Sequence, residues 1–493
     1  MGFGFGVLGL VEYKLTAPVI VHEWGTFTSL QDEQGQAIGG INVDDEPVPD
    51  FVCDIGGVRP TRSTSPSKDV FGGDLYPTKG WKPGDADVTM RLETPVLYFY
   101  PPRGELTQWA PPLDVHVDFH GGVLSQFYPY AEMEGLTGRF PFQDIALSAL
   151  TTRLTWKGVK LGSSGKPVET DDKVWTTPRE VSAPVLEVKV PGGPSSEKTQ
   201  AERFLFYRGV GHLDSPIFVA NDGSKIRGSM EMGALSSSGI CAIDSAWIVE
   251  IRPGGSCAQR QLTSTWLQPG GQSGVKLNVD ASISGFNCFP NFSAAFSDSD
   301  FSADSLPKLK ASMQAALVKE GLFPDEASAM LRTWELSYFK SPGLRFFYIV
   351  PRTWVDKVLP LTITGAPTEI TRVMVGRIEL ITDEQRAALA RLAAGPCPDL
   401  AAIKKSATDA LENGKLSKEE VAAFYRGEKP LSDLGIAIPP LVQDYLSLGR
   451  FRDALIMHEE HEHPSPALAQ FIKDNLLASE GIFSTIPATG VSR

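Results

Sequence analysis

The stretch VIVHEWGTFTS, residues 19–29, is the starting point for predicting the fold of this chain. An apolar segment precedes His22 and Glu23. A tryptophan, a glycine and three residues with hydroxyl side chains follow them. Neighbouring side chains of an extended chain point to opposite faces. His22, Trp24 and Thr26 are therefore predicted to share one face of a β-strand, with Glu23 on the other face.

Further strand patterns follow along the chain. Residues 86–102, ADVTMRLETPVLYFYPP, are apolar on both faces after Thr94, which predicts a central strand buried on both sides. Residues 114–122, DVHVDFHGG, alternate apolar with polar side chains, which predicts a strand with one buried face. More short strands, separated by turn residues, continue up to residue 300. This spacing is typical of a β-sandwich or a pair of them.

The pattern changes after residue 300. In residues 307–320 and 324–340 the apolar positions recur every three to four residues, which predicts helices. Residues 343–351 and 371–381 return to a strand pattern. We expect these two strands to pair with each other or to extend the preceding sheet.

A capping-box pattern from Thr382 to Gln385 predicts the start of another helix, and helical pieces continue to the end of the chain. The predicted class is α+β, with a β-sandwich-rich N-terminal region and a mixed, then helical, C-terminal region. The predicted parts are an apolar N-terminal segment (1–15), a β-rich, sandwich-like region (16–300), a mixed α/β segment that adds strands to the sheet (301–395) and a helical C-terminal region (396–493).

Size and charge narrow the possible functions. The chain has 493 residues, of which 42% are hydrophobic and 21% are charged, as expected for a folded protein of two or three domains. Its formal net charge of −13 repels nucleic acids and anionic membranes, so no nucleic-acid partner is expected. The sequence leaves the oligomeric state open.

Residues 1–15 contain an apolar run that resembles the core of a signal peptide, although no basic residues precede it. The run is either a remnant of an export signal or a first β-strand, and it is too short to span a bilayer. No membrane span is expected. If the protein is exported, Cys241 and Cys257 could close a disulfide; the alternative is that all five cysteines are reduced and buried.

Residues 40–80 are rich in proline and glycine, which predicts a long loop. Loops of this length in a compact domain are often binding segments or lids. The sequence does not distinguish a lid from a plain surface loop.

Four strings, HEWGTFTS (22–29), RLETPVLYFY (91–100), RFLFYRG (203–209) and VPRTWVDKVLPLTI (350–363), resemble those of a group of uncharacterised bacterial proteins, many of them exported. The similarity extends over most of the chain in scattered blocks. It implies a periplasmic or extracellular location and carries no function that can be transferred. The signal peptide of this chain is not convincing, so a cytoplasmic location also stays open.

The densest group of chemically active residues lies in the opening stretch. His22, with Glu23 and with Glu93 on another strand, could supply an imidazole and carboxylates to a divalent metal ion. Glu23 and Glu93 could instead act as a pair in acid–base catalysis. Because His22 and Glu23 point to opposite faces, they can share one ion only if the strand bulges near Gly25. The alternative is structural: Trp24 belongs to the core, and Glu23 forms a buried ion pair with Arg91.

A second candidate metal site lies on the 114–122 strand, where His116, Asp118 and His120 share one face. Alternate residues on a strand are close enough for two of them to bind one ion. The competing interpretation is an ordinary solvent-facing surface. Three aromatic side chains are predicted to bind substrate: Tyr128 and Tyr130, near the end of this strand, and Trp24 in the opening stretch.

Residues 409–420, DALENGKLSKEE, partly match a calcium-binding EF-hand loop. Leu411 stands where the loop needs an oxygen ligand, so calcium binding is not expected there. The sequence has no GxSxG nucleophile elbow, no Walker loop and no dinucleotide-binding fingerprint.

Two functional hypotheses remain. The first is a metal-dependent enzyme, hydrolytic by preference, in which a divalent ion activates water and Glu23 or Glu93 is the general base. It requires His22, Glu93 and His116 or His120 around one concavity. The second is a non-catalytic, exported protein that binds a small molecule, a glycan or a protein, or that takes part in surface assembly.

Overall fold

The α+β class is confirmed, because one large mixed sheet and several separate groups of helices make up the structure. It was obtained as a computed structural model. The described residues are 18–43, 48–49, 51–55, 81, 84–102, 111–136, 146–190, 198–221, 225–231, 243, 245–262, 285–293, 296–396, 400 and 439–476.

Fifteen of the described strands form the main sheet. Its central strands, β1 and β3, are the predicted stretches around residues 19–29 and 86–102, and β3 is buried on both sides as expected. The main path runs in the order β14 (Cys257–Leu262), β13 (Ala246–Ile251), β16 (Gly343–Ile349), β18 (Thr368–Leu380), β1 (Val19–Gln31), β3 (Met90–Tyr100), β10 (Leu205–Gly211), β5 (Gly122–Tyr128), β7 (Thr151–Leu161), β4 (Leu113–His120) and β17 (Leu361–Thr364).

Short strands extend this sheet, and a smaller sheet accompanies it. β2 pairs with β5, β6 and β8 pair with β7, and β9 pairs with β8. A separate sheet has the order β11, β12, β15. The bounds of these strands are β2 (Cys53–Asp54), β6 (Glu132–Glu134), β8 (Leu186–Val190), β9 (Lys198–Glu202), β11 (Ile217–Asn221), β12 (Lys225–Glu231) and β15 (Gly285–Ser293).

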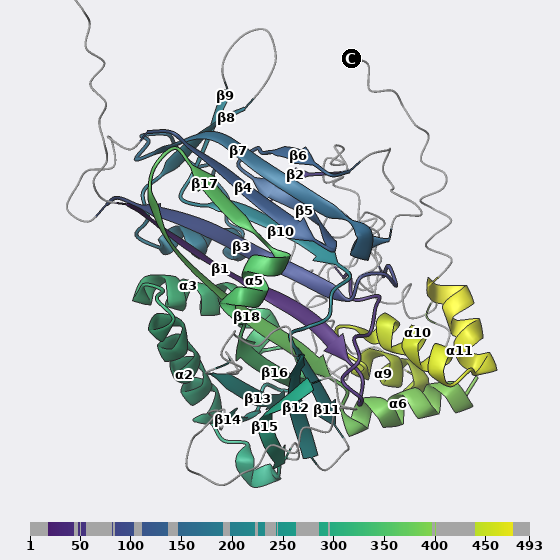
Figure 1. Ribbon diagram of the computed structural model, residues 1–493. Coiled ribbons are helices and arrows are strands. Elements are labelled where there is room, and N and C mark those ends of the chain that lie inside the picture. Colours follow the sequence, from purple (N-terminus) through teal and green to yellow (C-terminus); the bar gives the residue numbers. More distant parts are fainter. Residues whose placement is uncertain are drawn as a thin grey trace, which may run out of the picture.

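The main sheet is strongly curled. β17 is the last strand of the path, beside β4, yet only residues 365–367 separate it from β18 in the sequence. Such a link spans at most about 14 Å. A flat sheet would place β17 seven strand spacings from β18, roughly 34 Å away. The sheet must therefore bend so that β4 and β17 come round towards β18 (Figure 1).

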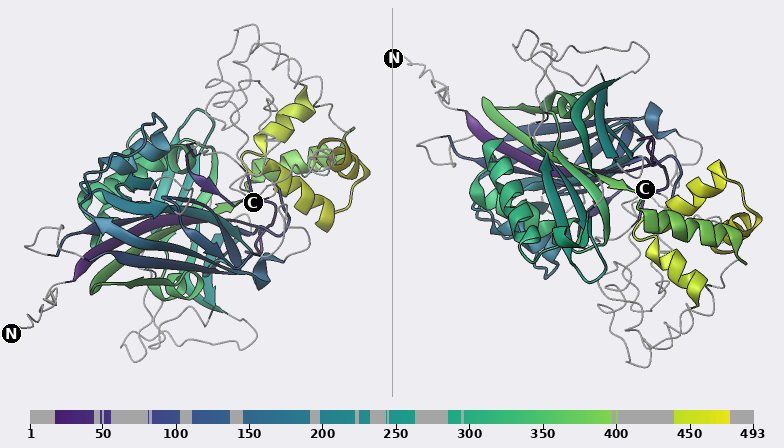
Figure 2. Two further views of the ribbon diagram at one scale, coloured as in Figure 1. Left: turned by 90° about the horizontal axis from the view of Figure 1, so that it is seen from above. Right: turned by 90° about the horizontal axis from the view of Figure 1, so that it is seen from below.

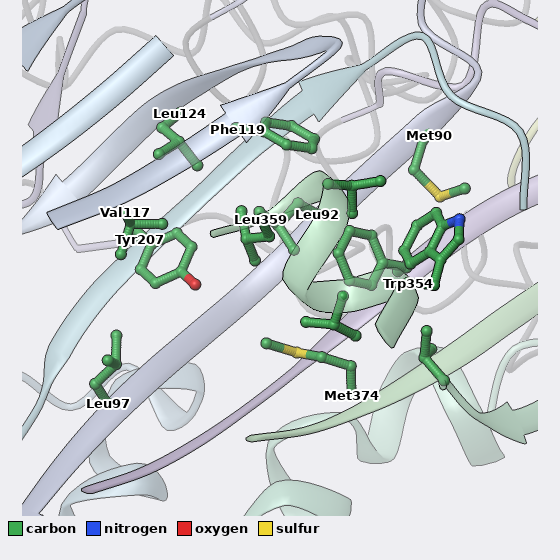
Figure 3. Packing of buried hydrophobic residues seen from close by; sticks show 14 of the residues in the cluster. Met90, Leu92, Leu97, Val117, Phe119, Leu124, Tyr207, Trp354, Leu359 and Met374 are labelled. Carbon is green, nitrogen blue, oxygen red and sulfur yellow. The ribbon is translucent and has the colours of Figure 1, made fainter. Parts of the chain in front are cut away.

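The inside of this curl is one hydrophobic core. It joins Leu92 and Met374 from one half of the sheet to Val117 and Leu124 from the other. The short helix α5 (Arg352–Val358) lies within the curl, and its Trp354 packs among these side chains (Figure 3). The predicted β-sandwich is not confirmed, because the strands that face each other across this core belong to one continuous sheet.

Helices cover part of the opposite face of the sheet. They pack on a second hydrophobic cluster that includes Trp24, Tyr98 and Trp334. The helix predicted over residues 324–340 is in fact two helices, which meet at Trp334. The helices on this face are α1 (Lys173–Thr176), α2 (Ser305–Lys319), α3 (Pro324–Thr333) and α4 (Glu335–Phe339).

The C-terminal helices pack at the other end of β1, where a third hydrophobic cluster includes Leu30 and Phe451 (Figures 1 and 2). The predicted capping box is present: the Thr382 hydroxyl accepts from Gln385 N, and the Gln385 side chain accepts from Thr382 N. These helices are α6 (Asp383–Ala394), α9 (Pro440–Ser447), α10 (Arg452–Glu462) and α11 (Pro466–Phe471). None of the described helices is both long and apolar enough to cross a membrane.

Candidate functional site: a buried arginine cluster

The two faces of β1 differ as the sequence predicts. Trp24 and Thr26 point towards α3 and α4, where the Thr26 hydroxyl is hydrogen-bonded to the Tyr338 hydroxyl. Phe27 points into the curl of the sheet and contacts Trp354. Trp24 is completely buried, so it is a core residue and does not present a surface to a substrate.

Glu23 lies on the inner face of the curl. Its carboxylate accepts hydrogen bonds from the Arg372 guanidinium and from the Tyr207 hydroxyl. The sequence predicted a buried ion pair but the wrong partner. Arg91 is paired in register with Thr28 and therefore lies on the opposite face of the sheet, whereas Arg372 is directly opposite Glu23 on β18. Each oxygen atom of the Glu23 carboxylate thus has a hydrogen-bond donor within the protein.

His22 is part of a different network, at the beginning of β1. Its Nδ1 lies 2.7 Å from the carboxylate of Glu326, which is buried at the start of α3. The same carboxylate accepts from the Tyr100 hydroxyl at 2.7 Å and from Phe323 N at 2.7 Å. The charge of Glu326 adds to the effect of burial in raising the pKa of Tyr100 well above its ordinary value. This network fixes α3 to the sheet.

A β-bulge in β3 sets the position of Glu93. Between the pairs Trp24–Val96 and Thr26–Glu93, one residue of β1, Gly25, lies opposite two residues of β3. A Cβ on Gly25 would approach the Cα of Pro95 to 2.9 Å, so this close approach requires glycine. The other bulge residue, Thr94, has a φ of 47°. The bulge places Glu93 on the same face as Thr26, where it reaches an arginine-rich part of the sheet.

We define the arginine cluster as Arg91, Arg345, Arg377 and Arg450 together with Glu93 and Glu379. Glu379 accepts from Arg345 Nε at 2.9 Å and from Arg377 Nε at 2.7 Å. Glu93 contacts Arg91 at 2.9 Å and Arg450 at 3.1 Å. Within this set, four guanidinium groups lie around two carboxylates. Arg91, Glu93 and Arg450 also have interactions beyond this set.

Three strands and one loop bring this cluster together. Arg377 and Arg91 flank the same residue of β1, Thr28, from the strands on its two sides. Arg345 lies on β16, directly opposite Glu379. Arg450 comes from the link between α9 and α10, so the C-terminal helices contribute to the cluster.

The charges of the cluster shift the pKa values of two of its members. Burial alone would raise the pKa of Glu379, but Arg345, Arg377 and Arg450 outweigh this effect and hold the pKa below its ordinary value. Burial lowers the pKa of Arg345 to about 10, with the Glu379 carboxylate opposing this effect and the charges of Arg377 and Arg450 adding to it. The arginines thus favour the charged form of Glu379, and they disfavour the charged form of one another.

Two buried polar atoms, one in this cluster and one on the residue of β1 beside it, make no hydrogen bond with the described residues. They are Arg377 Nη1 and Thr28 Oγ1, on residues paired in register between β18 and β1. An unsatisfied buried donor costs about 1–3 kcal/mol, and more when it is charged. An acceptor-rich, negatively charged group is therefore the chemical partner that suits this position.

The second predicted metal site is arranged as a β-sheet surface. His116 Nδ1 lies 3.0 Å from the Thr155 hydroxyl, and His120 is exposed. Asp118 forms a two-pronged ion pair with Arg153. The alternation of the strand is confirmed, because its apolar residues belong to the inner core.

The predicted metal-binding residues are not brought together. β4, with His116 to His120, is separated from β3, with Glu93, by three strands. His22 and Glu93 share a face, but four residues of strand, roughly 13 Å, separate their positions. Within the described ranges, no three His, Cys, Asp or Glu side chains form a group that could hold a metal ion. Each predicted ligand instead has the protein partner given above, except the exposed His120.

The two tyrosines predicted to bind substrate lie in different surroundings. Tyr128 is buried between Phe51 and Trp175, and burial raises its pKa to about 12. Tyr130 is half-buried and its backbone N–H donates to the Gln200 side chain. Neither residue contacts the arginine cluster in any described interaction.

Several predictions fall outside the described residues. They concern the apolar segment 1–15, most of the loop 40–80, the calcium-loop match 409–420 and the partner Cys241 of the predicted disulfide. Cys257 itself is a buried free thiol.

Comparisons with models of known protein families, with curated proteins and with solved structures each found no match. The resemblance to exported bacterial proteins stays a prediction. The chemistry of the site must therefore be argued from its own residues.

Sequence reasoning identified Glu93 and Arg91, although with the wrong partner for Arg91, and missed the other three arginines. The signal was present in two stretches, GLRFFYIVP (343–351) and TRVMVGRIELI (371–381). Arginine and glutamate inside otherwise apolar strands predict buried charges, because the neighbouring residues will be buried on both faces. Which charges meet one another depends on the strand order, which these patterns do not contain.

Proposed function

We propose that this protein binds a small ligand through an oxyanion group, such as a phosphate or a carboxylate, at the arginine cluster. The observation that carries the proposal is the pair formed by Arg377 Nη1 and Thr28 Oγ1. Both atoms are buried without a hydrogen-bond partner among the described residues, and Arg377 carries a positive charge.

The chemistry of arginine supports an anionic ligand. The planar guanidinium group matches carboxylate and phosphate oxygens with two parallel hydrogen bonds. An unsatisfied N–H of a buried guanidinium group is costly, and a bound anion would accept a hydrogen bond from it. Arg377 and Arg345 stand on central strands, which hold them in fixed positions.

The strained residue beside the cluster is a second supporting observation. Thr94 adopts a left-handed conformation, which is uncommon for a residue other than glycine and costs of the order of 1–3 kcal/mol. Such strain is found preferentially at binding and catalytic sites. Here it accompanies the bulge that turns Glu93 towards the arginines.

This proposal belongs to the binding class of hypotheses. The metal-dependent hydrolase expected from the sequence stays a prediction, since its residues are dispersed over separate places in the described structure. An acidic glycan or an anionic small molecule would present the required oxygen atoms.

The test uses the full-length protein and inorganic phosphate as the probe. Isothermal titration calorimetry is expected to show binding of about one phosphate per chain in a background of sodium chloride. At a concentration one hundred times Kd, the free energy of unfolding should rise by roughly 2.7 kcal/mol. Citrate is the probe for a carboxylate ligand under the same conditions.

Two variants locate the binding. Thr28→Val keeps the size of the side chain and the charges of the cluster but removes the hydroxyl, and Arg377→Gln removes the charge. Both are expected to weaken binding at least tenfold. Arg153→Gln, at an exposed arginine on β7, is the matched control and should bind like the wild type. Failure of both phosphate and citrate to bind, or unchanged binding by Thr28→Val, would overturn the proposal.

A further inference from the structure

Two tryptophans between the sheet and the helices α3 and α4 have indole N–H groups without a hydrogen-bond partner. Trp24 and Trp334 are both 0% exposed, and neither Nε1 atom makes a hydrogen bond with the described residues. A buried indole N–H usually has a partner, because an unsatisfied donor away from water costs free energy. Four other buried tryptophans donate from Nε1 at 2.8–2.9 Å, namely Trp81, Trp156, Trp175 and Trp247.

Contacts at the two ends of this layer place both indoles within it. His22 contacts the first turn of α3, and Thr26 contacts Tyr338 of α4. Trp24 lies between these two residues on the same face of β1, and Trp334 lies at the junction of α3 and α4. Both indoles belong to one hydrophobic cluster, on the face of the sheet that carries the arginine cluster.

Tyr338 connects the indoles to the proposed binding site. Its ring is stacked on that of Trp334, with 6.1 Å between the ring centres and 17° between the planes. The guanidinium group of Arg377 lies over the same tyrosine ring, at 5.9 Å from its centre. The Tyr338 hydroxyl is hydrogen-bonded to Thr26, which precedes Thr28 by two residues on one face of β1. The unsatisfied atoms of the binding site and of the indoles are therefore neighbours.

The unsatisfied atoms on this face are mostly donors. Indole and guanidinium nitrogen atoms can only donate, whereas the Thr28 hydroxyl can also accept. A water molecule that accepts from two of these donors must itself donate two hydrogen atoms, and Thr28 offers the one acceptor among them. A carbonyl, carboxylate or phosphate oxygen satisfies the same donors and needs no acceptor in return.

The surroundings of the indoles select an uncharged acceptor. Trp24 packs against Tyr98, and the residues beside it on the neighbouring strands are Val96 and Val373. A second anionic group would be buried among these side chains, which is far more costly than burial of a hydrogen-bonded carbonyl group. Ligand sites typically combine such apolar walls with a few well-placed polar groups.

We propose that the ligand of the arginine cluster is an organic anion with an uncharged carbonyl oxygen several carbon atoms from its oxyanion group, as in an oxo acid. Arg377 and Thr28 bind the oxyanion, and the N–H groups of Trp24 and Trp334 donate to the carbonyl oxygen. The ring of Trp24 presents no surface to solvent, so its N–H group is the part that meets the ligand. The inference rests on the proposed binding function and names the class of its ligand.

The experiment compares two carboxylates of equal chain length, 7-oxooctanoate and octanoate, by calorimetry with the full-length protein. They differ only by the carbonyl group. Two additional hydrogen bonds of ordinary strength should make the oxo acid bind roughly tenfold more tightly. The pair 5-oxohexanoate and hexanoate repeats the comparison with a shorter chain, and the proposal requires the preference in at least one pair.

Two variants locate the carbonyl-binding donors. Trp24→Phe and Trp334→Phe remove the N–H group and keep an aromatic ring, and each should reduce the preference for the oxo acid about threefold or more. The ratio of the two Kd values is the readout, because a general loss of stability affects both acids alike. Trp354→Phe is the matched control, since Trp354 packs inside the curl on the other face of the sheet, and it should keep the wild-type preference.

The outcomes separate the two proposals. If phosphate binds to the wild type but neither oxo acid binds more tightly than its plain counterpart, the ligand class is overturned and the binding function stands. A preference that persists unchanged in both tryptophan variants also overturns it. If these variants do not fold, the wild-type comparison decides alone. If neither phosphate nor citrate binds to the wild type, the binding function fails and the ligand class fails with it.

Discussion

Glu23 and Arg372 form an ion pair in which both side chains are 0% exposed, on residues paired in register between β1 and β18. This parallel strand pair joins residues near the start of the chain to residues near position 370. The Tyr207 hydroxyl donates to the same carboxylate from β10. The glutamate of the HEWGTFTS stretch thus stabilises the fold at the centre of the sheet.

Glu23→Gln is expected to lower the free energy of unfolding by up to about 3–5 kcal/mol, because it leaves the buried Arg372 charge with only the half-exposed carboxylate of Asp356 as an ionic partner. Urea unfolding of the full-length protein measures the change. Arg153→Gln, which breaks the exposed pair with Asp118, is the control and should cost less than about 1 kcal/mol. A loss of similar size in both variants would contradict the stabilising role of the buried pair.

Glu379 is expected to make stability depend on pH in the acid range. Its pKa is lower in the folded protein than in the unfolded chain, because the surrounding arginines outweigh the effect of burial. Its contribution is therefore fully present above the ordinary carboxylate pKa of about 4.3 and is lost as the pH falls below it. Glu379→Gln should reduce the free energy of unfolding more at pH 6 than at pH 3. An equal reduction at both pH values would show that the carboxylate charge has no such role.

Glu326→Gln should loosen the start of α3. The carboxylate accepts from His22, Tyr100 and Phe323 N, and a hydrogen bond to a charged group contributes about 1.5–3 kcal/mol. Hydrogen exchange of residues 324–333 should become faster. Asp325→Asn, at the adjacent residue of the same turn, is the matched control and should have a smaller effect. Equal exchange in the two variants would mean that the buried network does not hold the helix.

Cys257 should resist thiol reagents in the native protein. Burial raises its pKa to about 11, so at pH 8 only about one thiol in a thousand is ionised, and only the thiolate reacts. Labelling with an aromatic disulfide, followed by peptide mapping, should mark Cys257 in denaturant and leave it unmarked under native conditions. Rapid native labelling would show that the thiol is accessible.

The sequence determined the local features that depend on neighbouring residues. Alternation along residues 19–29 predicted which side chains share a face, and the apolar run after Thr94 predicted a strand buried on both sides. The capping box at Thr382 predicted the beginning of α6 within one residue. These predictions succeeded because the spacing of side chains along a strand or helix is fixed by its backbone geometry.

Only the tertiary structure decided which residues meet. Glu23 lies beside Arg372, nearly 350 positions away, and His22 lies beside Glu326. The arginine cluster depends on the strand order β16–β18–β1–β3 and on the bulge at Thr94, which puts Glu93 on the face of Thr26. Periodicity gives the face of each side chain but not the neighbouring strand. The charge pattern of the site therefore arises from the strand order, which places arginines from distant parts of the sequence on neighbouring strands.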